Sequence, residues 1–175
     1  PAGWGGDPAW AGARWMAAEL GDDGAAFAAA LPLSRVAATA AAVRIVHGTP
    51  ESNREGIGPW TDDATLARIV AAVAEPVLVG AHTHRPLVRD LGHHLVVNTG
   101  SVGLPFNGDP RAQYAVLSDD GAGGTGWRAE HRAVPYDRAA IRRIYRDSGF
   151  MAAGGVTSAL LAIELETARS VLVPY

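Results

Sequence analysis

The chain has 175 residues, 15 basic and 18 acidic side chains, a formal net charge of −3 and no cysteine. The absence of cysteine excludes disulfides, zinc–thiolate sites and a thiol nucleophile, so any metal must bind to nitrogen and oxygen ligands. Every basic residue is an arginine, and no stretch concentrates them into a patch, which argues against a nucleic-acid scaffold role.

The start of the sequence and its apolar stretches bear on whether the chain is whole and whether it enters a membrane. The sequence opens at Pro1 without an initiator methionine, so we expect a processed or partial chain, with residues 1–175 forming a single, partial domain. The longest apolar stretches fall short of the roughly 20 residues that a membrane-spanning helix needs, and no signal-peptide pattern is present. We therefore expect a cytoplasmic protein with no membrane partner.

The N-terminal region predicts two helices followed by two strands. Asp7 and Pro8 supply an N-cap and a first-turn proline for a helix that ends at Gly21. The next predicted elements are a helix over 22–31 and strands over 36–38 and 43–46. The stretch 49–60 is rich in Gly, Pro, Asn and charged residues, which predicts an irregular loop. Loops of this kind often carry binding groups.

The rest of the chain alternates between strand and helix patterns. Leu66, Ile69, Val70 and Val73 recur at helical spacing after the capping residues 61–63, in a predicted helix that Glu75-Pro76 ends. The apolar run 77–79 predicts a buried strand. The remaining predicted elements are strands over 85–90 and 95–98, a hairpin of 113–118 with 127–134, and helices over 137–147 and 157–169. This order predicts an α/β sandwich with mixed sheets.

Three histidines stand where a predicted strand gives way to a loop, namely His47, His82 and His84. Strand ends are where α/β folds place ligand sites, and imidazole binds zinc, iron and related divalent metals. His82 and His84 are two residues apart, so in an extended segment they point to the same side. Gly48 and Gly80 flank the histidines where backbone turns tightly or approaches a ligand. The alternative for such histidines is hydrogen bonding within a turn.

Three motifs occur in a fixed order along the chain, namely His47-Gly48-Thr49-Pro50, Gly80-Ala81-His82-Thr83-His84 and Asn98-Thr99-Gly100-Ser101-Val102-Gly103. Their combination resembles the calcineurin-like metallophosphoesterases, in particular small bacterial and archaeal phosphodiesterases, over residues 47–135. The resemblance implies a metallophosphoesterase-like αββα sandwich with mixed sheets, from which the N-terminal strands are missing. It also implies that His47 and His82 ligate one metal and His84 the other, with Asn98 and Ser101 shaping the turn behind the site.

Other motifs of that family do not occur in this sequence: D-x-H, G-D-x-x-D and G-N-H-[DE]. They would supply the bridging carboxylate, the remaining ligands and the histidine that assists the leaving group, so no catalytic residue is assigned. The resemblance implies two divalent metal ions, of manganese, iron or zinc, since histidine ligands disfavour magnesium. Such a pair activates a water for attack on a small phosphorylated substrate. Three neutral imidazoles do not offset the repulsion between two cations, so we predict that the 175 residues are inactive or nearly so.

Two alternatives to a truncated metal-dependent phosphodiesterase stay open at this point. One is a non-catalytic metal-binding or scaffold remnant of the same fold, and the other is a mononuclear zinc hydrolase with three histidine ligands. Missing central strands would leave unpaired edges, so we expect poor solubility or a homo-oligomer. The remaining histidines, His93, His94 and His131, are interpreted as surface residues.

Overall fold

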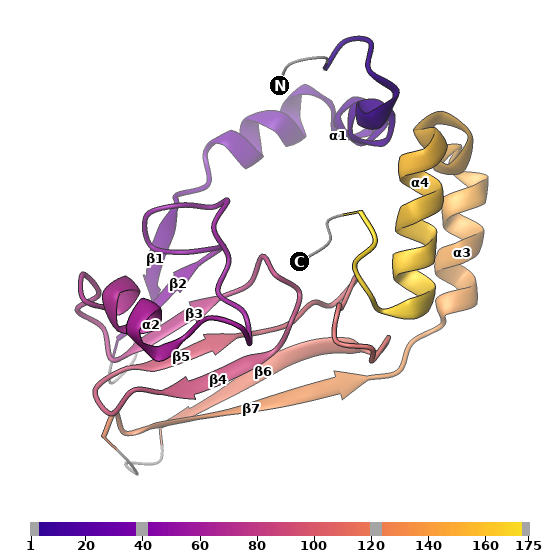
Figure 1. Ribbon diagram of the computed structural model, residues 1–175. Helices are drawn as coiled ribbons and strands as arrows, with labels where there is room; N and C mark the ends of the chain where they lie inside the picture. The colour runs from indigo at the N-terminus through magenta and orange to yellow at the C-terminus, as the bar shows by residue number, and fades with distance from the viewer. Residues whose placement is uncertain (1–3, 38–41, 120–123, 173–175) are drawn as a thin grey trace. The chain divides into compact units, whose positions relative to one another are not determined.

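The computed structural model describes residues 4–37, 42–119 and 124–172 and divides the chain into two compact units (Figure 1). One unit is continuous, Pro32–Pro135, and contains all three sequence motifs. The other combines Pro1–Leu31 with Tyr136–Tyr175. Each unit is described by itself, and the single domain expected over residues 1–175 stays a prediction.

A five-stranded mixed sheet forms the centre of the unit Pro32–Pro135. Its strands, in spatial order, are β1 (Ser34–Ala37), β2 (Val43–Val46), β3 (Val77–Gly80), β5 (Leu95–Asn98) and β4 (Leu87–Asp90). The three central strands are parallel to one another, and the two edge strands are antiparallel to their neighbours. Ile45 pairs with Val79 and Val79 with Val97, so the carboxyl ends of the central strands meet at one edge of the sheet.

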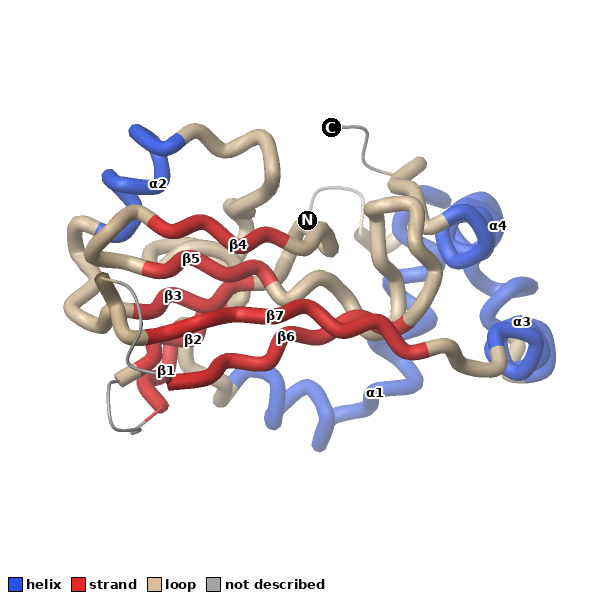
Figure 2. The backbone as a smooth tube through the Cα atoms, turned by 90° about the horizontal axis from the view of Figure 1, so that it is seen from below, coloured by secondary structure: helices blue, strands red, loops and turns tan. Residues whose placement is uncertain are grey.

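Both faces of this sheet are covered by other elements of the same unit (Figures 1 and 2). Because successive side chains of a strand point to opposite faces, Leu78 and Val96 join one cluster while Val77 and Val97 join the other. Helix α2 (Asp63–Val70) packs on the first face. The antiparallel hairpin of β6 (Ala112–Asp119) and β7 (Trp127–Val134) packs on the second. The result is a mixed α/β fold with two packed sheets, as the sequence predicts.

Helix α2 begins and faces the sheet for reasons visible in its sequence. The carboxylate of Asp62 accepts a hydrogen bond from the Thr65 backbone N–H at 2.7 Å, which satisfies one of the free N–H groups at the helix start. Leu66 and Val70 are four residues apart and both are buried, which places them on one helical face. The predicted helix is therefore confirmed, but it ends at Val70, before the predicted end at Glu75-Pro76.

The second unit consists of helices: η1 (Pro8–Trp10), α1 (Ala11–Ala29), α3 (Arg138–Asp147) and α4 (Phe150–Thr167). A kink at Gly21, with φ 66°, interrupts α1 where the sequence predicts one helix ending and another beginning. The last helix starts at Phe150, seven residues before the predicted start, with a bend at Gly155. Phe150 is buried against Trp15 and Tyr145, each with ring centroids 5.2 Å away. This aromatic packing offsets the low helix propensity of the two glycines that follow.

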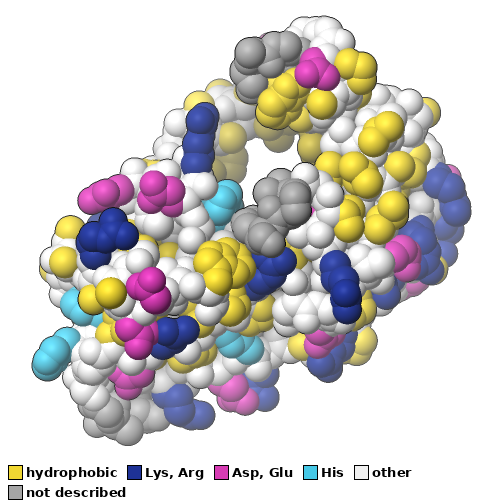
Figure 3. Space-filling view, viewed as in Figure 1, with side chains coloured by type: hydrophobic (Ala, Val, Ile, Leu, Met, Phe, Trp, Pro, Cys, Tyr) yellow, Lys and Arg dark blue, Asp and Glu magenta, His cyan; other side chains and the backbone are white. Residues whose placement is uncertain are grey.

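Helix α4 is long and apolar enough, by length and composition alone, to cross a membrane. Core helices of water-soluble proteins meet the same criterion, so this observation is weak. The helix also carries a buried carboxylate, Glu164, which accepts hydrogen bonds from the backbone N–H groups of Val171 and Leu172. Hydrophobic side chains gather on the side of this region that Figure 3 shows. Val156 and Ile163 of α4 are exposed.

Candidate metal centre

The structure brings His47 and His82 together at the carboxyl edge of the central parallel strands. Each follows one of two neighbouring strands, β2 and β3, and the backbone N–H of Ala81 donates to the His47 carbonyl at 2.9 Å. Nε2 of His47 lies 3.0 Å from Nδ1 of His82, and the ring centroids are 5.0 Å apart at 74°. Two imidazoles separated by 34 residues of chain therefore point their nitrogens at each other.

This pair of nitrogens fits one divalent cation. With metal–nitrogen bonds of about 2.0–2.1 Å, two imidazole nitrogens on one cation lie about 3.0–3.4 Å apart. The 3.0 Å separation, which is also a hydrogen-bond distance between the two rings, lies at the short end of that spacing. The fit is partial, because within residues 4–37, 42–119 and 124–172 no group of three or more His, Asp or Glu side chains is assembled to hold a metal.

Two glycines allow the loop after β2 to pack beside the histidine pair, in which His47 is exposed. A Cβ on Gly48 would lie 2.1 Å from the carbonyl oxygen of Glu55, so only glycine fits the closed loop there. A Cβ on Gly56 would lie 2.4 Å from Cγ2 of Thr83 and 3.0 Å from Cδ2 of His82. The loop therefore packs directly against the segment that carries the second histidine motif.

The segment after β3 is not extended, which changes one premise of the sequence argument. The strand ends at Gly80, and both His82 (φ 63°) and His84 (φ 56°) adopt the left-handed conformation. Positive φ is uncommon for residues other than glycine, and such strain collects at functional sites. His82 and His84 therefore do not share a side through strand alternation, and each ring is placed by its own contacts.

His84 lies near the pair but is held by different partners. Its Nδ1 is 2.7 Å from the carbonyl oxygen of Leu104, and its ring stacks on Phe106 with centroids 4.9 Å apart at 25°. It is close enough for its charge to act on His47. The ligand roles of His47, His82 and His84 remain predictions, with the first two in mutual contact and the third beside them.

The electrostatic environment keeps His47 in the form that binds metals. Partial desolvation of the ring lowers the pKa of His47 below its ordinary value of 6.5, although the residue is exposed, and the charges of His82 and His84 lower it further. Only a neutral imidazole has a free nitrogen lone pair for a cation. The clustering of the three rings therefore favours the metal-binding state near neutral pH.

Asn98 connects the loops around the site, as the structural role predicted for it requires. It is fully buried, and its Nδ2 group donates toward the carbonyls of Ile57 (2.8 Å) and Ala81 (2.6 Å) and the hydroxyl of Thr83 (2.9 Å). Its Oδ1 accepts from the N–H of Gly100 at 3.0 Å. One side chain thus holds the loop after β2, the second histidine motif and the loop after β5.

Ser101 also has the structural role predicted for it. Its hydroxyl oxygen accepts a hydrogen bond from the backbone N–H of Leu104 at 3.0 Å. This bond shapes the turn that presents the Leu104 carbonyl to His84. The contribution of Leu104 and Phe106 to the site was missed at the sequence level, because neither residue type signals chemistry.

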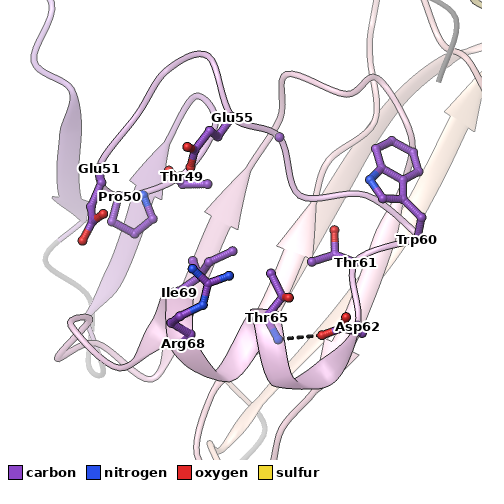
Figure 4. Close-up of a pocket in the computed structure, with 11 residues that line it drawn as sticks. Thr49, Pro50, Glu51, Glu55, Trp60, Thr61, Asp62, Thr65, Arg68 and Ile69 are labelled. Carbon is purple, nitrogen blue, oxygen red and sulfur yellow. Dashed lines mark hydrogen bonds between the residues drawn. The ribbon is translucent and has the colours of Figure 1, made fainter.

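A cavity of about 650 Å³ lies beside the histidine pair, between the loop after β2 and helix α2 (Figure 4). Arg68 and Ile69 rise from α2 toward the loop, and Trp60 stands at one end. The charged residues that line it are Glu51, Glu55, Asp62 and Arg68. Gly56 lines the cavity and also packs against His82.

Two of the histidines interpreted as surface residues make specific contacts instead. Nε2 of His131 donates to the Asn98 carbonyl at 2.7 Å, and Nε2 of His94 to the Val73 carbonyl at 3.0 Å. Both are half-buried, whereas His93 is exposed as expected. A carbonyl partner fixes the proton on Nε2 of each ring, so these two histidines serve as structural hydrogen-bond donors.

The comparison with protein families agrees with the motifs and with the fold. A family model for the calcineurin-like phosphoesterase superfamily domain matches residues 19–121. The chain belongs to this superfamily. No curated protein matches the chain.

Solved structures support the same fold over most of the chain. A hypothetical protein from Pyrococcus horikoshii OT3 has a TM-score of 0.70 and 20% identity, over 88% of this chain and 57% of that one. A metallophosphoesterase from Sphaerobacter thermophilus has a TM-score of 0.69 and 22% identity, over 89% of this chain and 65% of that one. The chain thus spans less than two thirds of the length of either neighbour, and the likeness concerns the fold.

Proposed function

We propose that this protein hydrolyses phosphate esters, with phosphodiesters as the substrate class, at a divalent-metal centre to which His47, His82 and His84 contribute imidazole ligands. The observation that carries the proposal is the 3.0 Å separation of Nε2 of His47 and Nδ1 of His82 at the carboxyl edge of parallel strands. Membership in the superfamily supports the dependence on metal ions.

The chain's own residues have separate tasks in this proposal. His47 and His82 bind the cation through neutral nitrogens, and Gly48 and Gly56 allow the loop to close beside them. A bound divalent cation supplies the acidity that generates hydroxide from water and neutralises charge on the phosphoryl oxygens. The described residues hold that cation in place and shape the space next to it.

The cavity beside the pair is the proposed place for the organic part of the ester. Its volume of about 650 Å³ lies within the usual range for small-molecule sites, roughly 300–1,000 Å³. Its lining has three carboxylates against one guanidinium, and like charges across an interface repel. We therefore propose esters whose alcohol part carries no further phosphate group.

We further propose that the 175 residues by themselves turn over substrate slowly or not at all. Among the described residues no carboxylate joins the histidines in a metal-binding group. Two divalent cations close together repel each other strongly, and an anionic bridging ligand is what offsets that repulsion. The chain alone is therefore expected to hold at most one cation firmly.

Metal titration and turnover test the proposal together. Zinc and manganese binding would be followed by calorimetry in the unmodified chain, His47→Gln, His82→Gln and the control His93→Gln, whose ring is exposed. We expect one cation, an affinity at least about tenfold weaker in the first two variants, and no change in the control. Equal binding in all four proteins would overturn the assignment.

Hydrolysis of bis(p-nitrophenyl) phosphate and of p-nitrophenyl phosphate tests the substrate class in the same proteins. We expect slow, manganese-dependent release of p-nitrophenol that is faster from the diester and lost in His47→Gln. Faster release from the monoester would contradict the diester assignment. One tightly bound zinc with rapid esterase turnover would instead favour the mononuclear three-histidine hydrolase.

A further inference from the structure

The ring of His84 is held in one protonation pattern by a carbonyl group. Its Nδ1 lies 2.7 Å from the Leu104 oxygen. A carbonyl oxygen only accepts hydrogen bonds, so Nδ1 carries the proton, and the lone pair of the neutral ring lies on Nε2. Nε2 is therefore the nitrogen of His84 that suits a cation.

Phe106 holds both the ring and the backbone of His84. The two rings stack with centroids 4.9 Å apart and an angle of 25° between their planes. The backbone N–H of Phe106 also donates to the His84 carbonyl at 2.9 Å. Tilting the imidazole out of its present plane would break both the stack and the Nδ1 hydrogen bond to Leu104, so these two contacts reinforce one ring plane.

Arg85 in turn holds Phe106. Its Nε donates to the Phe106 carbonyl at 3.1 Å, and its guanidinium carbon lies 6.0 Å from the Phe106 ring centroid. The same guanidinium lies 5.2 Å from the centroid of the Trp60 ring, which lines the cavity. Contacts of a cation with aromatic faces at this range are attractive. Arg85 therefore ties the second histidine motif to the Phe106 segment and to the cavity wall.

These contacts also counter the local strain at His84. The residue adopts φ 56°, a conformation that persists only when its surroundings over-determine it. The bonds to Leu104 and Phe106 and the stacked ring provide three independent restraints on this one residue. His84 is therefore a pre-organised side chain.

We propose that Phe106 and Arg85 are positioning residues that lock His84 in the Nδ1–H tautomer and present Nε2 as its ligand nitrogen. The role of Nε2 as a ligand rests on the proposed metal-binding function. The tautomer itself is a property of the metal-free chain. Outer partners of this kind orient metal-binding histidines, and their loss weakens metal affinity by about 10–100-fold.

The tautomer is measured directly by long-range ¹H–¹⁵N correlation NMR of the histidine rings in the metal-free protein. We expect a single Nδ1–H pattern for His84 in the unmodified chain and in Phe106→Tyr, which keeps the aromatic ring. We expect a mixture of tautomers in Phe106→Leu and in Arg85→Gln. The control is Arg89→Gln. Arg89 lies at the other end of β4 and forms its ion pair with the exposed Asp63 of α2.

Zinc affinity is a second measurement, and a residue with only a structural role would leave it unchanged. By calorimetry, Phe106→Leu and Arg85→Gln should bind zinc at least about tenfold more weakly, with Phe106→Tyr and Arg89→Gln unchanged. Should Phe106→Leu fail to fold, Ser101→Ala takes its place, since it removes the acceptor of the Leu104 N–H.

The inference is overturned if the unmodified chain shows the Nε2–H pattern, or if Phe106→Leu and Arg85→Gln keep the unmodified pattern and affinity. A chain that binds no zinc but shows the expected shift in tautomer would contradict the proposed function alone. The two proposals therefore fail through different measurements.

Discussion

Replacing Asn98 by alanine should release the three loops that surround the histidines. Asn98 has no exposed surface, and its amide contacts Ile57, Ala81 and Thr83 as well as Gly100. Asn98→Ala removes every one of these contacts without adding bulk. The perturbation thus tests whether the sequence motif that contains Asn98 supports the site by hydrogen bonding.

The size of the effect follows from counting donors and acceptors. The amide has two protons for its donor contacts, and Oδ1 accepts one further bond, so three net hydrogen bonds are lost. At about 1 kcal/mol each, with the Gly100 N–H left buried and the Ala81 carbonyl half-buried, the loss is roughly 3–4 kcal/mol. That is a large part of the stability of a typical domain, about 5–15 kcal/mol.

Urea denaturation followed by circular dichroism measures this loss. The matched control is Asn53→Ala, because Asn53 is exposed in the loop after β2 and such changes cost less than about 0.5 kcal/mol. The reasoning fails if Asn98→Ala lowers the free energy of unfolding by less than about 1 kcal/mol, the value of a single hydrogen bond. It also fails if the two variants are equally stable.

Two further predictions concern the same loops. Gly48→Ala places a methyl group 2.1 Å from the Glu55 carbonyl oxygen, so denaturation should show a loss of about 1–3 kcal/mol, with no comparable loss in Gly103→Ala, which meets no atom within 4 Å. The lowered pKa of His47 means that its stabilising contribution is complete above 6.5 and is lost as pH falls from 6.5 toward the lowered pKa. Melting temperatures between pH 7.5 and 5 should therefore fall less steeply in His47→Gln, and parallel curves would contradict this.

The pairing of His47 with His82 was accessible from sequence because it depends on general rules of parallel sheets. Each residue follows an apolar strand, and the carboxyl ends of neighbouring parallel strands meet at one edge. The orientation of His84 was not accessible in this way. It depends on a left-handed backbone and on contacts with Leu104 and Phe106, about twenty residues away, that no local pattern encodes.

Similar reasons separate the predicted from the unpredicted parts of the fold. Helix α2 carries its own cap and an apolar face, so its sequence determines it. Helix α4 extends through Gly154 and Gly155, against local propensity, because Phe150 is buried against the nearby Tyr145 and against Trp15, which is distant in sequence. His131 bonds to Asn98 across 33 residues, which only the packing of the hairpin on the sheet reveals.

Zinc K-edge X-ray absorption on the chain loaded with one equivalent of zinc tests most directly whether His47 and His82 share a cation. The account predicts a first shell with at least two imidazole nitrogens at about 2.0–2.1 Å, and one imidazole fewer in His82→Gln. A first shell of oxygen alone, or one that is identical in the two proteins, would contradict it.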